Sequence, residues 1–198
     1  MNGNSEPVTL ARDVDASVIP IGTKVTLQKG EQANITQSLG GSYTVTNDRG
    51  YMYRIDASDA DAIGLTAALP EPPPSDLGNF NEQLVWEQLK TVFDPEIPVN
   101  IVDLGLIYSC EITPVDAGNK IDIKMSMTAP GCGMGNVLKA DVDSKLSGLP
   151  GVKEVDVEVV FDPAWHPGLM SDAAKLQLGF DLDYGTTHAS PPIYGERK

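Results

Sequence analysis

The sequence predicts an α+β protein with two folded parts: a small all-β domain over residues 1–68 and an α-β-β-α-β domain, with a short last helix, over residues 79–180. The boundary is a proline-rich stretch at residues 69–78, which cannot continue a helix or a sheet ladder and acts as a semi-rigid spacer. Before it, short β-type runs alternate with turn residues; after it, apolar residues also recur at helical spacing. We expect residues 181–198 to form a loose tail.

Four short β-type runs predict the strands of the first domain. Turn residues separate them at 29–31, 40–41 and 47–50, as in a series of hairpins. We therefore expect a small antiparallel sheet or open barrel. It holds neither Cys nor His, and we interpret it as an interaction or docking module. The runs are residues 24–27, 33–36, 43–46 and 51–55.

A helix and a hairpin are expected at the start of the second domain. Apolar residues at helical spacing follow Asn79 or Asn81 as the N-cap and stop before Asp94 and Pro95. Alternating apolar residues then predict strands at 102–112 and 121–127, joined by a turn at 116–119. The helical positions are Leu84, Val85, Leu89, Val92 and Phe93.

The rest of the second domain is predicted as helix, strand and short helix. Apolar residues at intervals of four give the helix, and alternation gives a strand with Val155, Val157, Val159 and Phe161 inward. Ser171 caps a last helix that runs to about Leu178 and ends at Gly179. The residues at intervals of four are Met134, Leu138, Val142 and Leu146.

Composition narrows the function classes. The formal net charge of −14, with no cluster of Lys or Arg, argues against nucleic acid as a partner. No stretch reaches the roughly 20 apolar residues of a membrane helix, and the first residues form no signal region, so we expect no membrane partner and a cytoplasmic location. In that reducing compartment the two cysteines are expected to be free thiols.

Cys132 is the main candidate for chemistry. It lies among glycines, Gly131 and Gly133, where the strand ending at Met127 passes into the next helix. The helix dipole and free N–H groups at such a position favour the thiolate, which is the form that binds metals, and the glycines leave the sulfur accessible. The alternative is a tight turn whose cysteine is merely buried.

Three acids form a second candidate group. Asp94, Glu96 and Asp103 lie in the loop before the hairpin, where they either supply oxygen ligands or accept backbone hydrogen bonds that shape the loop. The residue types favour loop shaping. Gly105, within an expected strand, indicates a bulge or a close approach by another backbone.

The remaining Cys and His residues are weaker candidates. Cys110 shares the parity of the apolar strand residues, which favours a small core side chain over a ligand. His166, between Trp165 and Pro167, is interpreted as structural.

Three blocks make residues from about 80 to 180 resemble the iron-sulfur cluster assembly domain shared by SufT-like and PaaD-like proteins. The first is Asp94-Pro95-Glu96 leading to residues 100–108, the second is residues 127–135 around Cys132, and the third is residues 161–165. Residues 18–22 and 37–43 also resemble the amino-terminal extension of SufT-like proteins.

This resemblance implies maturation of iron-sulfur proteins, by carrying or delivering clusters or by bringing the assembly machinery to client proteins. It makes Cys132 the metal and cluster ligand, with a supporting loop of Asp94, Glu96, Asp103, Thr128, Gly131 and Gly133. Because clusters generally take four protein ligands, a cluster on Cys132 is expected to be transient and shared across a homodimer or with a partner. Two alternatives stay open: a metal-free adaptor for clients, and an enzyme with Cys132 as its nucleophile.

Overall fold

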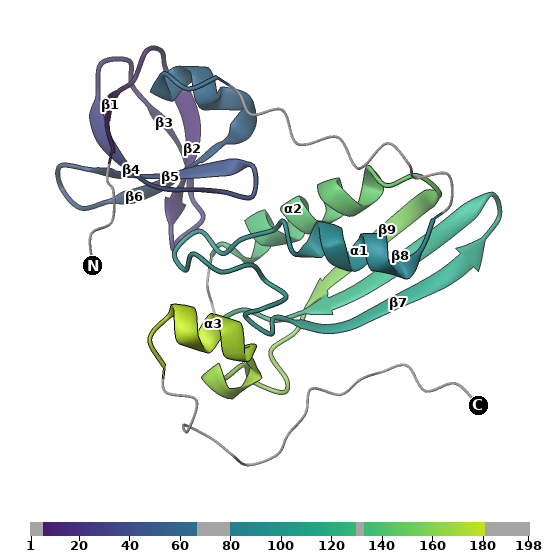
Figure 1. Cartoon of the computed structure of the whole chain (residues 1–198). Coiled ribbons are helices and arrows are strands. Elements are labelled where there is room, and N and C mark those ends of the chain that lie inside the picture. Colours follow the sequence, from purple (N-terminus) through teal and green to yellow (C-terminus); the bar gives the residue numbers. More distant parts are fainter. Residues whose placement is uncertain (1–5, 67–79, 130–132, 181–198) are drawn as a thin grey trace. The chain divides into compact units, whose positions relative to one another are not determined.

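The computed structural model describes residues 6–66, 80–129 and 133–180 (Figure 1). The predicted linker at 69–78 and the tail at 181–198 lie outside these residues. Contacts divide the described chain into two compact units. The first unit joins residues 6–66 to residues 91–98 and 133–138; the second unit contains residues 80–90, 99–129 and 139–180.

An antiparallel six-stranded sheet, in the order β1-β4-β5-β6-β2-β3, forms most of the first unit. This confirms the expected small antiparallel sheet. The four predicted runs correspond to β3 through β6, whereas β1 and β2 were not predicted, because β1 is short and β2 contains Asp15 and the small residues Ala16 and Ser17. The strands are β1 (Glu6–Thr9), β2 (Val14–Ile19), β3 (Lys24–Leu27), β4 (Gln32–Leu39), β5 (Ser42–Asn47) and β6 (Met52–Asp56).

One face of this sheet curls around an apolar core. Alternate residues such as Tyr43 and Val45 point into it, and the 3₁₀ helix η1 (Ala57–Ile63) contributes further buried side chains. Reciprocal backbone hydrogen bonds of Leu10 with Gly30 and Glu31 tie the end of β1 to the turn after β3. These bonds extend the pairing of β1 with β4 by one further residue.

The register of β4 against β5 shifts between Ile35 and Gln37. Thr36 is the extra residue of this β-bulge, and beyond it Gln37 pairs with Thr44. A bulge re-aims the side chains that follow it. The bulge thereby places Gln37 opposite Thr44, which faces away from the apolar core because it alternates along β5 with the core residues Tyr43 and Val45.

The second unit confirms the predicted α-β-β-α-β order. Its sheet has the order β7-β8-β9, with β7 antiparallel and β9 parallel to β8. Asn81 is the N-cap of the first helix, and its side chain accepts a hydrogen bond from Leu84 N at 3.0 Å. The elements are α1 (Glu82–Leu89), β7 (Ile107–Val115), β8 (Gly118–Met125), α2 (Gly135–Ser147), β9 (Val152–Val159), η2 (Pro167–Leu169) and α3 (Asp172–Gln177).

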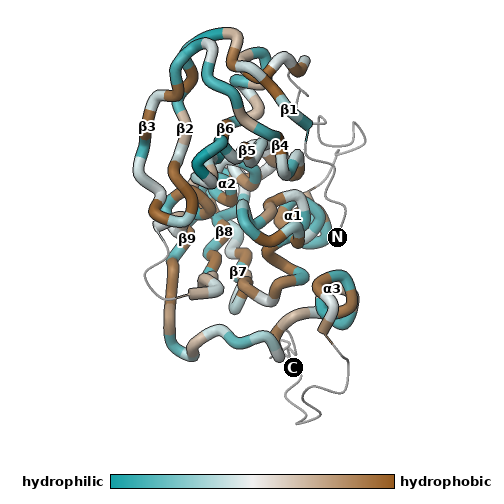
Figure 2. The backbone as a smooth tube through the Cα atoms, turned by 90° about the vertical axis from the view of Figure 1, so that its left-hand side faces the viewer, coloured by the Kyte–Doolittle hydropathy of each residue, from teal (hydrophilic) through white to brown (hydrophobic). Residues whose placement is uncertain are grey.

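Helix α1 and residues 139–147 of α2 cover one face of the three-stranded sheet (Figure 1). That face carries Ile121, Ile123 and Met125, all at most 1% exposed. The opposite face is polar, with ion pairs from Lys120 to Glu154 and from Lys124 to Glu158. Hydrophobic and hydrophilic residues interleave along α1 and α3, as expected for helices with one buried side (Figure 2).

Two details of the predicted strands were wrong. Residues 102–106 form a turn before β7, held by local backbone bonds such as Leu104 N to Asn100 O and Leu106 N to Ile101 O. Leu104 and Leu106 are fully buried, so two apolar residues of a turn have the same alternating pattern as residues of a strand. Phe161 is 47% exposed, because β9 ends at Val159 and the chain leaves the sheet there.

Candidate functional site

The acidic loop Asp94–Glu96 is shaped by the first of its acids. Asp94 is 4% exposed, and its Oδ1 accepts hydrogen bonds from Glu96 N at 2.8 Å and Ile97 N at 3.0 Å. This is an Asx-type turn, in which a short carboxylate closes the backbone on itself. Glu96, two residues on, is exposed.

Both acids of this loop hold their protons more tightly than usual. Burial raises the pKa of Asp94, against the two backbone N–H donors, which lower it. Loss of part of its hydration, followed by repulsion from the charge of Asp94, raises the pKa of Glu96. The fold therefore brings two carboxyl groups together and makes the ionisation of each less favourable than in an isolated side chain.

Asp103 lies in the second unit and shapes a different turn. Its Oδ2 accepts a hydrogen bond from Asn100 Nδ2 at 2.6 Å, while Asn100 Oδ1 accepts from the backbone N–H groups of Val102 and Asp103. The carbonyl of Asp103 accepts from Ser171 N at 2.8 Å, which ties the turn to the start of α3.

The third sequence block is fastened to this same turn. Trp165 Nε1 donates to Leu104 O at 2.8 Å, and the hydroxyl of Tyr108 donates to Pro163 O at 3.0 Å. Gly105 has φ +70°, and a Cβ at this position would meet the carbonyl group of Leu169, 2.7 Å from its carbon. Gly105 is therefore a position of close backbone approach, one of the two roles that its sequence context indicated, but it lies in a turn and not in a strand.

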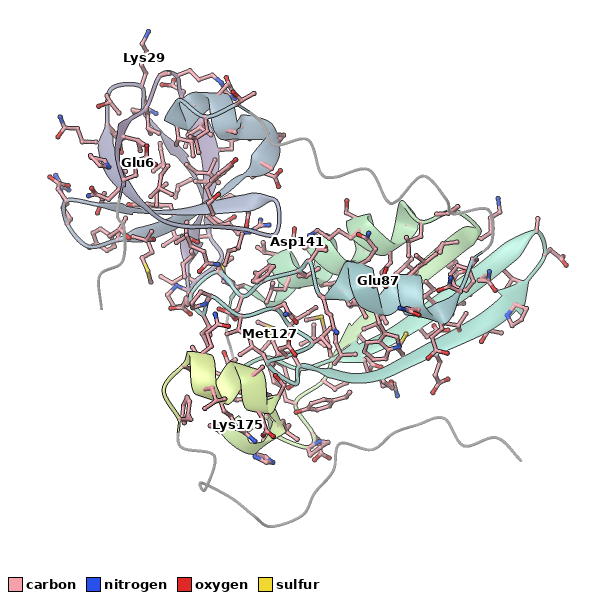
Figure 3. The ribbon with its side chains drawn as sticks, viewed as in Figure 1. Glu6, Lys29, Glu87, Met127, Asp141 and Lys175 are labelled. Atoms are coloured by element: carbon pink, nitrogen blue, oxygen red, sulfur yellow. The ribbon has the colours of Figure 1, made fainter. Side chains whose placement is uncertain are left out.

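Cys132 and Gly131 lie outside the described residues, so the structure gives their neighbours only. Before them, Met127 is buried, with its side chain in the packed interior (Figure 3), and Thr128 is half-buried. After them, Met134 O accepts hydrogen bonds from Val137 N and Leu138 N, and α2 begins at Gly135.

Gly133 is held against the turn between β2 and β3, within the first unit. A Cβ on Gly133 would collide with the carbonyl group of Ile21 and lie 3.0 Å from its Cα. A Cβ on Gly22, where φ is +75°, would collide with the carbonyl group of Gly133 in the same way. Only glycines allow the two backbones to come this close.

Cys110 and His166, the weaker candidates, both have structural roles. Cys110 is half-buried in β7, where burial, with smaller contributions from the charges of Glu82 and Glu111, raises the pKa of its thiol to about 12. His166 is the N-cap of η2, and its Nδ1 accepts a hydrogen bond from Gly168 N at 3.2 Å.

Three polar residues near these loops were not predicted. Thr44 and Gln37 donate to the backbone of the acidic loop, and Ser126, which is fully buried, has no hydrogen-bond partner for its Oγ among the described residues. Serine and threonine are mostly exposed residue types, so no sequence signal marked Thr44 or Ser126 as buried.

Within the described ranges, no group of three or more His, Cys, Asp and Glu side chains is arranged to hold a metal ion. No helix in the same ranges combines the length and apolar character needed to cross a membrane.

Comparison with known proteins connects these blocks to one family. The family model described as "Iron-sulfur cluster assembly protein" matches residues 82–159, and thus none of the strand-rich residues 6–66. A "Fe-S protein maturation auxiliary factor" of Porphyromonas gingivalis is 41% identical over 99 residues, which are 50% of this chain and 91% of that protein.

Two further relatives give the same result. YitW of Bacillus subtilis, a Fe-S protein maturation auxiliary factor, is 37% identical over 46% of this chain and 86% of its own length. SufT of Staphylococcus aureus, with the same description, is 35% identical over 44% of this chain and 97% of its own length. The chain spans nearly the whole of each relative at well above 30% identity, and it therefore belongs to the iron-sulfur cluster assembly protein family.

Proposed function

We propose that this protein is a maturation factor for iron-sulfur proteins, in which the Cys132 thiolate takes part in carrying a cluster or handing it to a client. The names of its relatives, among them an "Iron-sulfur cluster carrier protein" of Deinococcus radiodurans that is 36% identical over 70 residues, support this role. The cluster is cargo, and the partners are the assembly machinery and client proteins.

The observation that carries the proposal is the contrast between the two cysteines. The Cys110 thiol, with a pKa of about 12, stays protonated at neutral pH and is a poor metal ligand. Cys132 lies three positions before the start of α2, in a Gly-Cys-Gly sequence. Free N–H groups and the helix dipole favour a thiolate at such a place.

A single available thiolate defines how a cluster is held. Iron-sulfur clusters generally take four protein ligands, so Cys132 supplies one, and a second copy of the chain, a partner protein or small thiols supply the rest. The cluster is then exchangeable, as a carrier requires. We place this work in the cytoplasm, where free thiols persist.

Anaerobic reconstitution with iron and sulfide tests the proposal. We expect the wild type to gain visible absorption and bound iron, Cys110→Ala to match it, and Cys132→Ala to remain colourless. A colourless wild type that still supports maturation of a cluster enzyme in cells would identify a metal-free adaptor instead.

Cysteine enzyme chemistry is the less favoured alternative, because it needs a general base beside the nucleophile. The Nδ1 atom of His166 accepts a backbone hydrogen bond as the N-cap of η2, so the imidazole has a structural role there. Alkylation of Cys132 across a pH series measures its pKa, and hydrolytic or thiol-transfer turnover without iron would favour the enzyme.

A further inference from the structure

Buried polar residues form a row on the face of the six-stranded sheet that points away from the apolar core. Thr44 on β5 pairs with Arg54 on β6, and Arg54 pairs with Ser17 on β2. All three are less than 9% exposed, although their neighbours along each strand point into the core. Something polar must cover this face, because buried polar groups need hydrogen-bond partners.

The acidic loop covers the Thr44 end of this row. Thr44 Oγ1 donates to Pro95 O at 3.0 Å, and Gln37 Nε2 donates to Asp94 O at 2.9 Å. Gln37 and Thr44 are direct cross-strand partners, so one pair of side chains holds two consecutive carbonyl groups. The bulge at Thr36 sets this pairing, since Ile35 pairs with Val45 in the preceding register.

The start of the same segment is fitted against the next turn of the sheet. Gly40, with φ +64°, lies under residues 91–93, and a Cβ there would lie 2.5 Å from Thr91 O and 2.9 Å from Phe93 Cδ2. Residues 91–95 therefore follow β4 and β5 closely along their length. Glu96, the next residue, is the exposed carboxylate at the end of this seated segment.

We propose that Thr44 and Gln37 are positioning residues that hold the Asp94–Glu96 loop in its working geometry, so that the strand-rich unit is part of the cluster-handling site. The group they place is the exposed Glu96 carboxylate, through the carbonyl groups of the two residues before it. The expected effect on cluster transfer rests on the proposed function, whereas the expected effect on the geometry of the loop does not.

The test compares three threonine variants of the full-length chain. Thr44→Val removes the hydroxyl at nearly constant volume, and Thr44→Ser keeps it. Thr46→Val is the matched control, because Thr46 lies two positions along the same strand face and makes no hydrogen bond to the loop in the described chain. The readouts are the Glu96 pKa, from carbon-13 NMR assigned with Glu96→Gln, and the rate of cluster transfer to an apo-ferredoxin.

We expect Thr44→Val to lower the pKa of Glu96 toward that of an ordinary glutamate, because a loop released from the sheet is more hydrated. Cluster transfer should slow roughly tenfold, the effect on rate expected from the loss of one positioning hydrogen bond. Thr44→Ser should restore both quantities, and Thr46→Val should leave both unchanged.

Wild-type values for the Glu96 pKa and for transfer in Thr44→Val would overturn the proposal, even if that variant is less stable, since Thr44 would then be only structural. Should Thr44→Val fail to fold, Gln37→Ala, at a half-exposed position, decides by the same two readouts. If the wild type itself transfers no cluster, the proposed function fails, while the Glu96 titration still decides whether the pair positions the loop.

Discussion

Replacement of Gly105 by alanine should lower the free energy of unfolding by more than the penalty for placing alanine in the left-handed backbone region. At φ +70°, an alanine pays about 1–2 kcal/mol for the left-handed backbone. Its Cβ would also displace the carbonyl group of Leu169. Leu169 is held between two hydrogen bonds, Trp165 Nε1 to Leu104 O and Ser171 N to Asp103 O, each 2.8 Å long.

The displacement therefore strains both hydrogen bonds, whose net contribution is about 1 kcal/mol each. The sum is a loss of roughly 3–4 kcal/mol, or about 10 °C in Tm for a chain of this size. Gly179→Ala is the matched control: φ is +78°, and nothing lies within 4 Å of an added Cβ. It should lose only about 1–2 kcal/mol.

Urea denaturation, followed by tryptophan fluorescence, measures the stability of both variants. Their midpoints can be compared if their m-values are equal. The difference between the two variants isolates the contact with Leu169. If Gly105→Ala lost no more stability than Gly179→Ala, the close approach that joins the first and third sequence blocks would be refuted.

Three further predictions concern the loops and cysteines. Burial raises the pKa of Asp94 in the folded state, so the contribution of this group to stability is complete below the unfolded pKa and is lost as pH rises through the folded pKa. As pH rises above about 4, the wild type should therefore lose stability relative to Asp94→Asn, and parallel pH profiles of the two proteins in urea denaturation would contradict this. Cys110, with a pKa of about 12, should be alkylated by iodoacetamide at pH 8 far more slowly than Cys132, as peptide mass spectrometry will show; equal rates would exclude the assigned burial. Gly133→Ala, which meets the Ile21 carbonyl group, should lower the urea midpoint clearly more than Gly148→Ala, whose Cβ has room at 3.6 Å, and similar midpoints would refute the contact.

Local sequence signals predicted the second unit well. In α2, the spacing of Val142 and Leu146 identified the buried face, because a helix repeats its environment every three to four residues. Ser171 was recognised as a cap, and Asn81 as one of two candidates with Asn79, because capping depends on a side chain and a backbone N–H only a few residues away.

Features that depend on distant residues were not predictable in this way. Leu104 is buried in a turn to which Trp165 and Ser171 are hydrogen-bonded from more than 60 residues further along the chain. Without these distant partners, the alternation of Leu104 with Val102 and Leu106 suggested a strand. Thr44 looks like any strand threonine until Pro95 is placed over it, 51 positions away.

The candidate site shows the same division. The sequence located Asp94 and Glu96 and suggested that acids before proline shape the loop, and the Asx-type turn of Asp94 has this form. It did not indicate that the loop is seated on a strand pair from the amino-terminal sheet, because a two-point contact with backbone carbonyl groups leaves no residue pattern in the loop itself.

The central claim is that Cys132 is the working thiolate of a cluster-carrying maturation factor. Its most direct test is anaerobic transfer of a reconstituted cluster to an apo-ferredoxin, run with the wild type, Cys132→Ala and Cys110→Ala under identical conditions. The account predicts transfer by the wild type and Cys110→Ala and none by Cys132→Ala, with all three proteins equally folded by circular dichroism. Undiminished binding and transfer by Cys132→Ala would contradict it.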